Sequence, residues 1–357
     1  MNNRKAPKIP KRSVAVDARL FAGTSTGDST YWTALLGAIQ EIAPEAPIQL
    51  FSDRPLEGAP FPVEVVRSRW GRLWSLVAFP LAARKAGAVH VQYALSPLIR
   101  KGISTIHDVS FFVEPSWFRG KDVALLKAGS RAAARRAAKI VTVSDPSREE
   151  IERWLPAAKG KTAVIANACP PWVQRVGDPR PALKRLGVEP PYLLTVGTRW
   201  PRKNMELAVQ AVDGLPDDWP HRLVVTGKTG WGDQELGRRG QATGYVSNDD
   251  LSALYAGAEL YLAPSRHEGF GIPLLEAMRC GCPVLASPIP AFRYAGGDAA
   301  AYALSFEAGD WTEWMVESLG DSGKMLGMRE RGLAWEPRFS WHESARRHLE
   351  IYAEVAG

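Results

Sequence analysis

Three cations stand directly after an apolar, β-branched run in the second half of the chain. Arg199, Arg202 and Lys203 follow the run 192–196 and precede a helical pattern. Gly197, at the end of the run, lets the backbone turn without steric cost. Cations beside a helix N-terminus form a good binding site for a diphosphate. We therefore predict an anion-binding loop here, and the alternative is a basic loop on the surface.

A second candidate site combines glycines with two carboxylates. Glu268 and Glu276 follow the run 260–263, and Pro273 marks the first turn of a helix. The N–H groups of 269–271 and the helix dipole suit an anion or sugar hydroxyls. Glu268 lies in the loop and Glu276 about one turn into the helix, so one can face a sugar while the other reaches a ribose diol. Taken alone, the segment also fits a tight turn with two surface carboxylates.

Short apolar runs alternate with helical patterns along the whole chain. In the first half we expect strands at 14–16, 88–91, 103–106, 140–143 and 163–165, and helices at 29–41, 73–85, 122–138 and 146–154. In the second half we expect strands at 192–196, 222–226, 260–263 and 284–286, and helices at 204–212, 249–256, 272–280 and 341–355. This alternation predicts two doubly wound α/β halves, whose sheets bind ligands beyond the carboxyl ends of their strands.

The length of the chain points to two domains, because 357 residues exceed the size at which one core usually stops growing. Prolines interrupt regular structure between 168 and 191. The predicted organisation is a basic N-terminal tail (1–12), a first Rossmann-like domain (13–170), a linker (171–191), a second Rossmann-like domain (192–337) and a C-terminal helix that crosses back to the first domain (338–357). We expect the chemistry in a central cleft that the two domains face.

The composition is that of an ordinary soluble protein, with 45% hydrophobic and 23% charged residues. No apolar stretch reaches the roughly 18 residues of a membrane span, and no apolar run follows the basic first twelve residues as in a signal peptide. A cytoplasmic protein is therefore expected. The net charge of +7 is compatible with nucleic acid, an anionic membrane or a phosphorylated substrate as partner.

Two further patterns are open to two interpretations. Arg131, Arg135, Arg136 and Lys139 have helical spacing, which fits a solvated helix face or a patch that meets phospholipid head groups. Cys280 and Cys282 stand two apart, but a structural zinc site needs four ligands at repeated spacings, so we predict buried free thiols and no metal.

The segment 268–284 closely resembles the two-glutamate motif of family-4 glycosyltransferases, which have the GT-B fold. It reads Glu-Gly-Phe-Gly-Ile-Pro-Leu-Leu-Glu-Ala-Met-Arg-Cys-Gly-Cys-Pro-Val. The resemblance extends upstream through 244–246 (Gly-Tyr-Val) and 264–265 (Pro-Ser). The loop 196–204 (Val-Gly-Thr-Arg-Trp-Pro-Arg-Lys-Asn) is similar to the family's diphosphate loop, and 106–111 (Ile-His-Asp-Val-Ser-Phe) and 141–144 (Val-Thr-Val-Ser) also resemble family segments.

The resemblance implies roles for the residues that match the motifs. Arg202 and Lys203 would neutralise the leaving diphosphate, Glu268 would hold the donor sugar, and Glu276 would bind the ribose. His107 would contact the sugar or the reacting centre from the other domain, unless it is a satisfied structural histidine. The donor would be bound further by Gly197 and Arg199 of the diphosphate loop, by backbone of Gly269, Phe270 and Gly271, and near the base by Lys228, Tyr245 and Val246.

Two departures from the family pattern concern the loops. Thr198 stands where the family usually has Arg, so Arg199 or Arg202 must supply the second cation. The usual Asn-Gly after the last strand of the first domain is here Asn167-Ala168, so this loop would differ in shape.

The implied activity is that of a retaining hexosyltransferase that uses a nucleotide-diphosphate sugar. We find no Asp-X-Asp, so we expect neither metal nor cofactor, with the cations in place of a divalent ion and the departing phosphate taking the acceptor's proton. The loop variant resembles bacterial mannosyltransferases of surface-polysaccharide assembly. This implies GDP-mannose as donor and a glycan or lipid-linked oligosaccharide as acceptor, bound around 23–28 and 111–118.

Other activities stay open from the sequence. A GT-B-fold sugar-nucleotide epimerase and a non-catalytic sugar-nucleotide-binding subunit are the alternatives, and a nucleic-acid binder rests on charge alone. With the basic tail, the positive charge fits peripheral contact with an anionic membrane, at the inner face of the cytoplasmic membrane.

Overall fold

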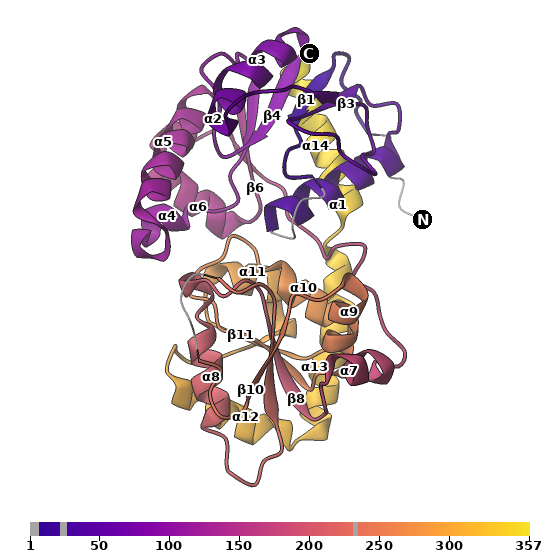
Figure 1. Ribbon diagram of the computed structural model, residues 1–357, viewed down its shortest axis with the longest axis vertical. Helices are drawn as coiled ribbons and strands as arrows, with labels where there is room; N and C mark the ends of the chain where they lie inside the picture. The colour runs from indigo at the N-terminus through magenta and orange to yellow at the C-terminus, as the bar shows by residue number, and fades with distance from the viewer. Residues whose placement is uncertain (1–6, 22–26, 231–234) are drawn as a thin grey trace. The chain divides into compact units, whose positions relative to one another are not determined.

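The computed structural model describes residues 7–21, 27–230 and 235–357, which form two compact units. Unit 1 comprises Met1–Asn167 and Ser340–Gly357, and unit 2 comprises Ala168–Phe339. Each unit has a parallel sheet of its own, covered by helices (Figure 1). The part 23–26 of the acceptor segment expected at 23–28 lies outside the described residues.

The sheet of unit 1 has seven strands in the order β3-β2-β1-β4-β5-β6-β7, and every described pair is parallel. The strands are β1 (Val14–Asp17), β2 (Ile48–Ser52), β3 (Val63–Val65), β4 (Ala88–Gln92), β5 (Gly102–Thr105), β6 (Lys139–Thr142) and β7 (Thr162–Val164). The predicted strands are confirmed to within a residue or two, but β2 and β3 were not predicted. These two form one edge of the sheet, where a strand is buried by fewer neighbours and its sequence is less uniformly apolar.

The helices of unit 1 are α1 (Gly27–Ile42), α2 (Gly71–Leu73), α3 (Phe79–Ala82), α4 (Ser110–Val113), α5 (Gly120–Arg136), α6 (Asp145–Trp154) and α14 (Trp341–Ala356). A π-turn, η1 (Trp74–Ala78), joins α2 to α3, and the 3-10 turn η2 (Ala83–Lys85) follows, so 71–85 forms one continuous helical segment. The predicted start of α6 is confirmed, because the Ser144 hydroxyl caps it by accepting from the Ser147 N–H (3.1 Å).

The C-terminal helix belongs to unit 1, where α14 packs along α1 (Figure 1). Its buried face carries Trp341, His348 and Tyr352. On the opposite face of the sheet, Trp74 stacks on Phe79 with ring centroids 4.9 Å apart. The core of unit 1 therefore contains segments from both ends of the chain.

The sheet of unit 2 has six strands in the order β10-β9-β8-β11-β12-β13, again parallel. The strands are β8 (Tyr192–Val196), β9 (Arg222–Thr226), β10 (Gly240–Gly244), β11 (Leu260–Ala263), β12 (Val284–Ala286) and β13 (Ala301–Tyr302). The helices are α7 (Arg180–Leu186), α8 (Met205–Asp213), α9 (Asn248–Gly257), α10 (Ile272–Arg279), α11 (Pro290–Gly296), α12 (Ala308–Leu319) and α13 (Ser322–Trp335). The four predicted strands are confirmed, whereas β10, β13 and α11 to α13 were not predicted.

The proline-rich segment expected as a linker lies within unit 2. Its helix α7 packs on α9, and its residues Leu183 and Val188 are buried. Burial of these apolar side chains stabilises the segment as part of the second core rather than as a free connection. The cysteines are three buried free thiols, as predicted.

Candidate active site

Two loops meet at the carboxyl edge of the sheet of unit 2, because β8 and β11 are neighbours. The loop after β8 contains the 3-10 turn η5 (Pro201–Lys203), and the loop after β11 contains Glu268. The Arg266 N–H donates to the Arg202 carbonyl (2.8 Å), and the Asn204 side chain donates to the Pro264 carbonyl (3.2 Å). These bonds fix the position of the cations relative to the glutamate.

Glu268 is the centre of a hydrogen-bonded charge cluster. Its Oε1 accepts from Lys203 Nζ (2.5 Å) and from the Ser265 hydroxyl (2.7 Å), and its Oε2 accepts from Arg202 Nη1 (2.9 Å). The three charged side chains are only 10–15% exposed. Burial alone would keep the carboxyl neutral, but Lys203 and Arg202 outweigh it and hold the pKa of Glu268 at about 2. Glu268 is therefore ionised at neutral pH.

Glu276 has the opposite electrostatic environment, on helix α10. It is buried, and its Oε2 accepts from the Tyr255 hydroxyl (2.9 Å). Burial raises the pKa of Glu276 to about 7, although the Tyr255 hydrogen bond, Lys203 and Arg279 oppose the rise. Helix α10 begins at Ile272, four residues after Glu268, so both glutamates belong to the segment that follows β11.

Close backbone packing shapes the edge of this site. Gly227, after β9, has φ 131°, and a Cβ there would lie 2.3 Å from the Gly197 carbonyl oxygen. Gly271 has φ 107° and stands immediately before helix α10. Glycine is favoured at these positions because φ is positive and, at Gly227, because there is no room for a Cβ. The loops therefore present backbone rather than side chains at the carboxyl edge of the sheet.

The remaining candidates for donor binding lie in loops that leave the same edge. The Arg199 N–H donates to the Lys228 carbonyl (3.2 Å), which joins the loops after β8 and β9. Tyr245 follows β10, is 56% exposed, and has Lys228 Nζ 5.3 Å from its ring centroid. Val246 is half-buried beside it. A partly exposed aromatic ring next to a cation suits a nucleotide base.

Phe270 contributes through its backbone position. Its side chain is buried and packs edge-to-face on Phe339, with centroids 5.4 Å apart, and on Tyr294 at 6.1 Å. The aromatic ring thus anchors the loop in the core of unit 2. Gly269 and Gly271, on either side of it, leave the backbone of the loop uncovered by side chains of their own.

His107 lies in unit 1, just beyond the end of β5. Its Nε2 is 3.6 Å from Asp28 Oδ1, and its ring meets the Tyr31 ring edge-on at 4.8 Å. Burial lowers the pKa of the imidazole, against the opposite effect of Asp28 and Asp108. The histidine is therefore neutral at pH 7 and able to donate or accept one hydrogen bond at each ring nitrogen.

A buried chain of hydrogen bonds supports the strand that carries His107. It joins Ser344, His348, Tyr31, Thr105, His90 and Tyr352, with distances of 2.7–2.9 Å. The donor and acceptor of every bond can be assigned by starting at Ser344. Its carbonyl can only accept, so it accepts from the Nδ1–H of His348. Tyr31 then donates to His348 Nε2, Thr105 to Tyr31, His90 Nε2 to Thr105, and Tyr352 to His90 Nδ1.

This chain connects helix α14 to the site in unit 1. Tyr31 lies at its middle and also touches His107, while Thr105 is two residues before His107. Burial lowers the pKa of His348 to about 4, so the ring stays neutral and keeps accepting from Tyr31. Sequence reasoning missed the chain, because Tyr31 and His348 are 317 positions apart and neither has a local signal.

Replacing Tyr31 by phenylalanine should destabilise unit 1 by about 2–6 kcal/mol, because the Thr105 hydroxyl and the His348 ring nitrogen each lose a buried partner at a cost of about 1–3 kcal/mol. Calorimetric unfolding of the full chain checks this. The control is Tyr192→Phe, since the Tyr192 hydroxyl makes one bond, to the Leu254 carbonyl (2.6 Å), and should cost less. Equal losses in the two variants would contradict the chain as described.

Replacing Glu276 by glutamine should stabilise the ligand-free protein in a pH-dependent way. The pKa in the folded state, about 7, lies above the ordinary 4.5, so the folded protein binds more protons between these values and the wild type loses stability as pH rises through them. The stability that the wild type loses over this pH range totals about 3 kcal/mol. The variant cannot ionise, so its advantage should be near zero at pH 4.5 and largest at pH 8.

Melting curves of wild type and Glu276→Gln from pH 4.5 to 8 measure this difference. Glu330→Gln, which changes an exposed carboxyl on α13, is the matched control. A difference that does not grow with pH, or that grows equally in the control, would show that burial does not hold a proton on Glu276.

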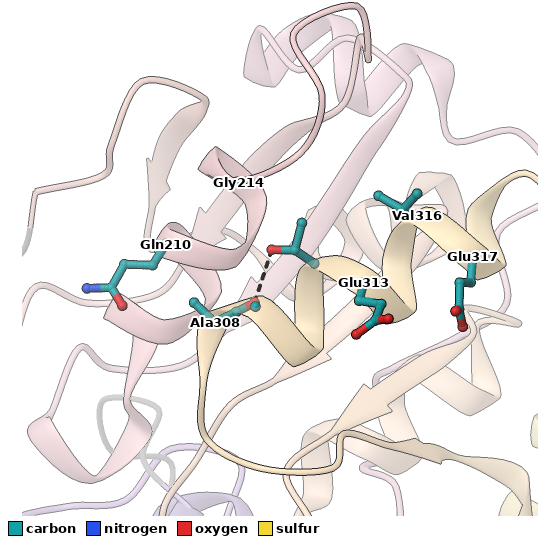
Figure 2. A pocket seen from close by; sticks show the side chains of 8 residues that line it. Gln210, Gly214, Ala308, Glu313, Val316 and Glu317 are labelled. Carbon is teal, nitrogen blue, oxygen red and sulfur yellow. Dashed lines mark hydrogen bonds between the residues drawn. The ribbon is translucent and has the colours of Figure 1, made fainter.

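A separate open pocket lies between α8 and α12 (Figure 2). Its lining includes Gln210 and Gly214 from the end of α8 and Ala308, Glu313 and Val316 from α12. Gly214 lies about 13 Å along the helix axis from the start of α8, which adjoins Lys203. The pocket is therefore distinct from the charge cluster, and we assign it no part in donor binding.

Comparison with known proteins agrees with the chemistry of the site. The family model described as "Glycosyl transferases group 1" matches residues 182–314, which contain both glutamates and the diphosphate loop. The O-antigen chain mannosyltransferase B of Escherichia coli is 32% identical over 268 residues, 71% of this chain and 70% of that protein. The chain belongs to the group 1 glycosyltransferases. It is therefore a sugar-transferring enzyme.

Solved structures agree on the fold. WaaG, a glycosyltransferase involved in lipopolysaccharide biosynthesis, has a TM-score of 0.76 at 16% identity, over 95% of this chain and 99% of WaaG. Anabaena HepE in complex with UDP-glucose has a TM-score of 0.74 at 16% identity, over 96% of this chain and 100% of HepE. The glycosyltransferase has the predicted GT-B fold, built from two Rossmann-like α/β units.

Proposed function

We propose that this glycosyltransferase transfers mannose from GDP-mannose to a glycan or lipid-linked oligosaccharide acceptor, with retention of configuration and without a metal ion. The observation that carries the proposal is the buried cluster of Arg202, Lys203 and Glu268 at the carboxyl edge of unit 2. The name of the E. coli relative, an O-antigen chain mannosyltransferase, supports mannose as the sugar.

The cations are suited to a diphosphate leaving group. Breaking the anomeric bond of a sugar nucleotide places negative charge on the departing phosphate, and fixed cations stabilise that charge without reorganising. Arg202 and Lys203 are fixed by Glu268 before any ligand binds. They provide here the charge that a divalent ion supplies in other transferases, and the absence of Asp-X-Asp from the sequence is consistent with this division.

Glu268 and Glu276 have different tasks in this proposal. Glu268, always ionised, orients the cations and accepts hydrogen bonds from hydroxyls of the donor sugar. Glu276, whose pKa is about 7, accepts from the ribose diol, and the Tyr255 hydroxyl holds its second oxygen. Arg199 adds a cation at the diphosphate, and Tyr245 and Val246 border the base.

The departing phosphate takes the proton of the acceptor hydroxyl as that hydroxyl attacks the same face of the sugar. The anomeric C–O bond to phosphate breaks, and the new C–O bond forms to the acceptor oxygen. No protein base is needed for this step, and neutral His107 of unit 1 is able to hydrogen-bond a hydroxyl. Unit 1 supplies the acceptor site, for which Phe111, buried, and Trp117 and Phe118, half-buried, lie in the expected segment.

A thermal-shift panel tests the donor. GDP, UDP, ADP and dTDP, each with a common sugar conjugate, are added to the protein in EDTA, since a ligand of the folded state raises the melting temperature. We expect a selective response to GDP and GDP-mannose that Glu276→Ala loses. A selective response to another nucleotide would overturn GDP-mannose, and no response to any nucleotide from folded protein would overturn the donor site.

Product analysis separates transfer from epimerisation. The proposal expects a mannosylated acceptor with retained configuration and free GDP. A free sugar or an epimerised sugar nucleotide formed without any acceptor would favour the epimerase instead.

A further inference from the structure

The helical segment 71–85 of unit 1 exposes an unusual apolar stripe. Leu73, Leu76, Val77 and Leu81 are all exposed, Leu76 by 50% and Leu81 by 48%. Leu73, Val77 and Leu81 stand four residues apart, and Leu76 stands beside Val77; their exposure places all four on the outward side of the segment. Trp70, directly before the segment, is 72% exposed. A stripe of this kind is costly in water and points to a partner.

The charged residues that flank the stripe in the sequence are all positive. Between Glu64 and Asp108 the sequence contains no carboxylate, but it contains Arg67, Arg69, Arg72, Arg84, Lys85, Arg100 and Lys101. All of them are exposed. An apolar stripe whose charged neighbours along the chain are all cations is complementary to a surface that is apolar inside and negatively charged outside.

The segment is held rigidly, so its exposure is not the result of a loose helix. Trp74, on its buried face, donates from Nε1 to the Val66 carbonyl (2.7 Å). The Arg19 guanidinium lies over the Trp74 ring at 4.0 Å and is itself paired with Asp17 (2.7 Å). Arg19 also donates to the Ser75 hydroxyl (2.8 Å). The core fixes one face of the segment and leaves the other outward.

A neighbouring loop extends the same surface. The Ser96 hydroxyl donates to the Leu76 carbonyl (2.7 Å), which ties the loop 94–101 to the segment. Leu98 in this loop is 52% exposed, and the Pro97 carbonyl accepts from Arg136 at the end of α5 (3.3 Å). Apolar and basic groups thus continue from the helical segment across the loop toward α5.

We propose that this surface, made by Trp70, Leu73, Leu76, Val77, Leu81 and Leu98 with the bordering cations, binds the interface of an anionic phospholipid bilayer. The leucines enter the boundary between head groups and acyl chains, Trp70 lies at the head-group level, and the arginines meet lipid phosphates. A second copy of the chain would place like charges against each other. No helix among the described residues is long and apolar enough to span a bilayer, so the contact is peripheral.

This inference goes beyond the donor chemistry and rests on different residues. It gives the expected contact with an anionic membrane a defined location on unit 1. A protein held in this way would meet a lipid-linked acceptor at the membrane surface. The enzyme and the acceptor would then find each other by diffusion along the bilayer.

Vesicle co-sedimentation of the full chain tests the proposal. Vesicles of phosphatidylcholine alone are compared with vesicles that also contain phosphatidylglycerol. We expect binding to the anionic vesicles that weakens with salt. The variant Leu73→Ser/Leu76→Ser/Leu81→Ser should bind at least about tenfold more weakly, and so should Arg69→Glu/Arg72→Glu/Lys85→Glu.

Leu304→Ser/Leu326→Ser is the matched control, because these leucines are more exposed than those of the stripe but lie in unit 2. It should bind vesicles like the wild type, and all variants should keep the thermal shift with GDP. Equal binding of the apolar variant and the wild type would overturn the proposal, as would equal binding to neutral and anionic vesicles. An oligomer in solution that the apolar variant dissociates would instead make the surface an interface between copies.

Discussion

Replacing Lys203 by alanine should lower kcat/KM for mannosyl transfer by about 10²–10³-fold, the cost of one preorganised group that stabilises developing charge. Lys203 Nζ lies 2.5 Å from Glu268 Oε1 in a site that is nearly dry, where its charge acts with little screening. The rate of GDP release from GDP-mannose measures the effect. It is followed with an acceptor present, or as hydrolysis of the donor when no acceptor is present.

Lys184→Ala on α7 is the matched control, because it removes an exposed lysine of the same unit. It should leave kcat/KM unchanged. If Lys203→Ala raised KM alone and kept kcat, the lysine would bind the ground state of the donor rather than the leaving group, and the proposed role would be wrong.

Replacing Glu268 by glutamine should separate GDP binding from sugar transfer. The variant keeps the shape of the side chain but leaves Arg202 and Lys203 without a counter-charge, so the diphosphate of GDP replaces the lost carboxylate and GDP affinity should hold or rise. Transfer should fall by about 10²-fold or more, because the carboxylate that orients the cations and the sugar is gone.

The same variant should also change the pH dependence of stability. In the wild type the pKa of Glu268, about 2, lies below the ordinary 4.5, so the pair stabilises the fold above pH 4.5 and that stabilisation is lost as pH falls toward 2. Breaking a buried pair costs about 3–5 kcal/mol, so Glu268→Gln should have a lower melting temperature than the wild type at pH 7. Its stability should not show the loss between pH 4.5 and 2 that comes from protonation of Glu268. Loss of GDP binding in folded Glu268→Gln would contradict the account.

The site of unit 2 could be predicted from the sequence because its parts follow a geometric rule. Lys203 and Glu268 each follow a buried strand, and parallel strands bring their carboxyl ends to one edge. The sequence does not reveal which side chains pair: Tyr255 stands 21 positions before Glu276, and Lys203 stands 65 positions before Glu268.

The elements that were missed share a physical cause. β10 lies at the edge of its sheet and reads Gly-Gln-Ala-Thr-Gly, with one β-branched residue and one small apolar residue, which is too weak a pattern to predict a strand. A helix was predicted at 73–85, but the π-turn within it was not, because hydrophobic periodicity does not show where a helix widens by one residue per turn. Long-range hydrogen bonds such as that of Tyr31 with His348 leave no local pattern at all.

The most direct test of the central claim is calorimetric titration of GDP into wild type and into Lys203→Ala, both in EDTA. The account predicts that the wild type binds GDP without metal and that the variant binds at least about tenfold more weakly, since it loses a charge-assisted contact worth about 1.5–3 kcal/mol. Equal affinities in the two proteins, or binding that requires a divalent ion, would contradict the claim that Arg202 and Lys203 hold the donor diphosphate.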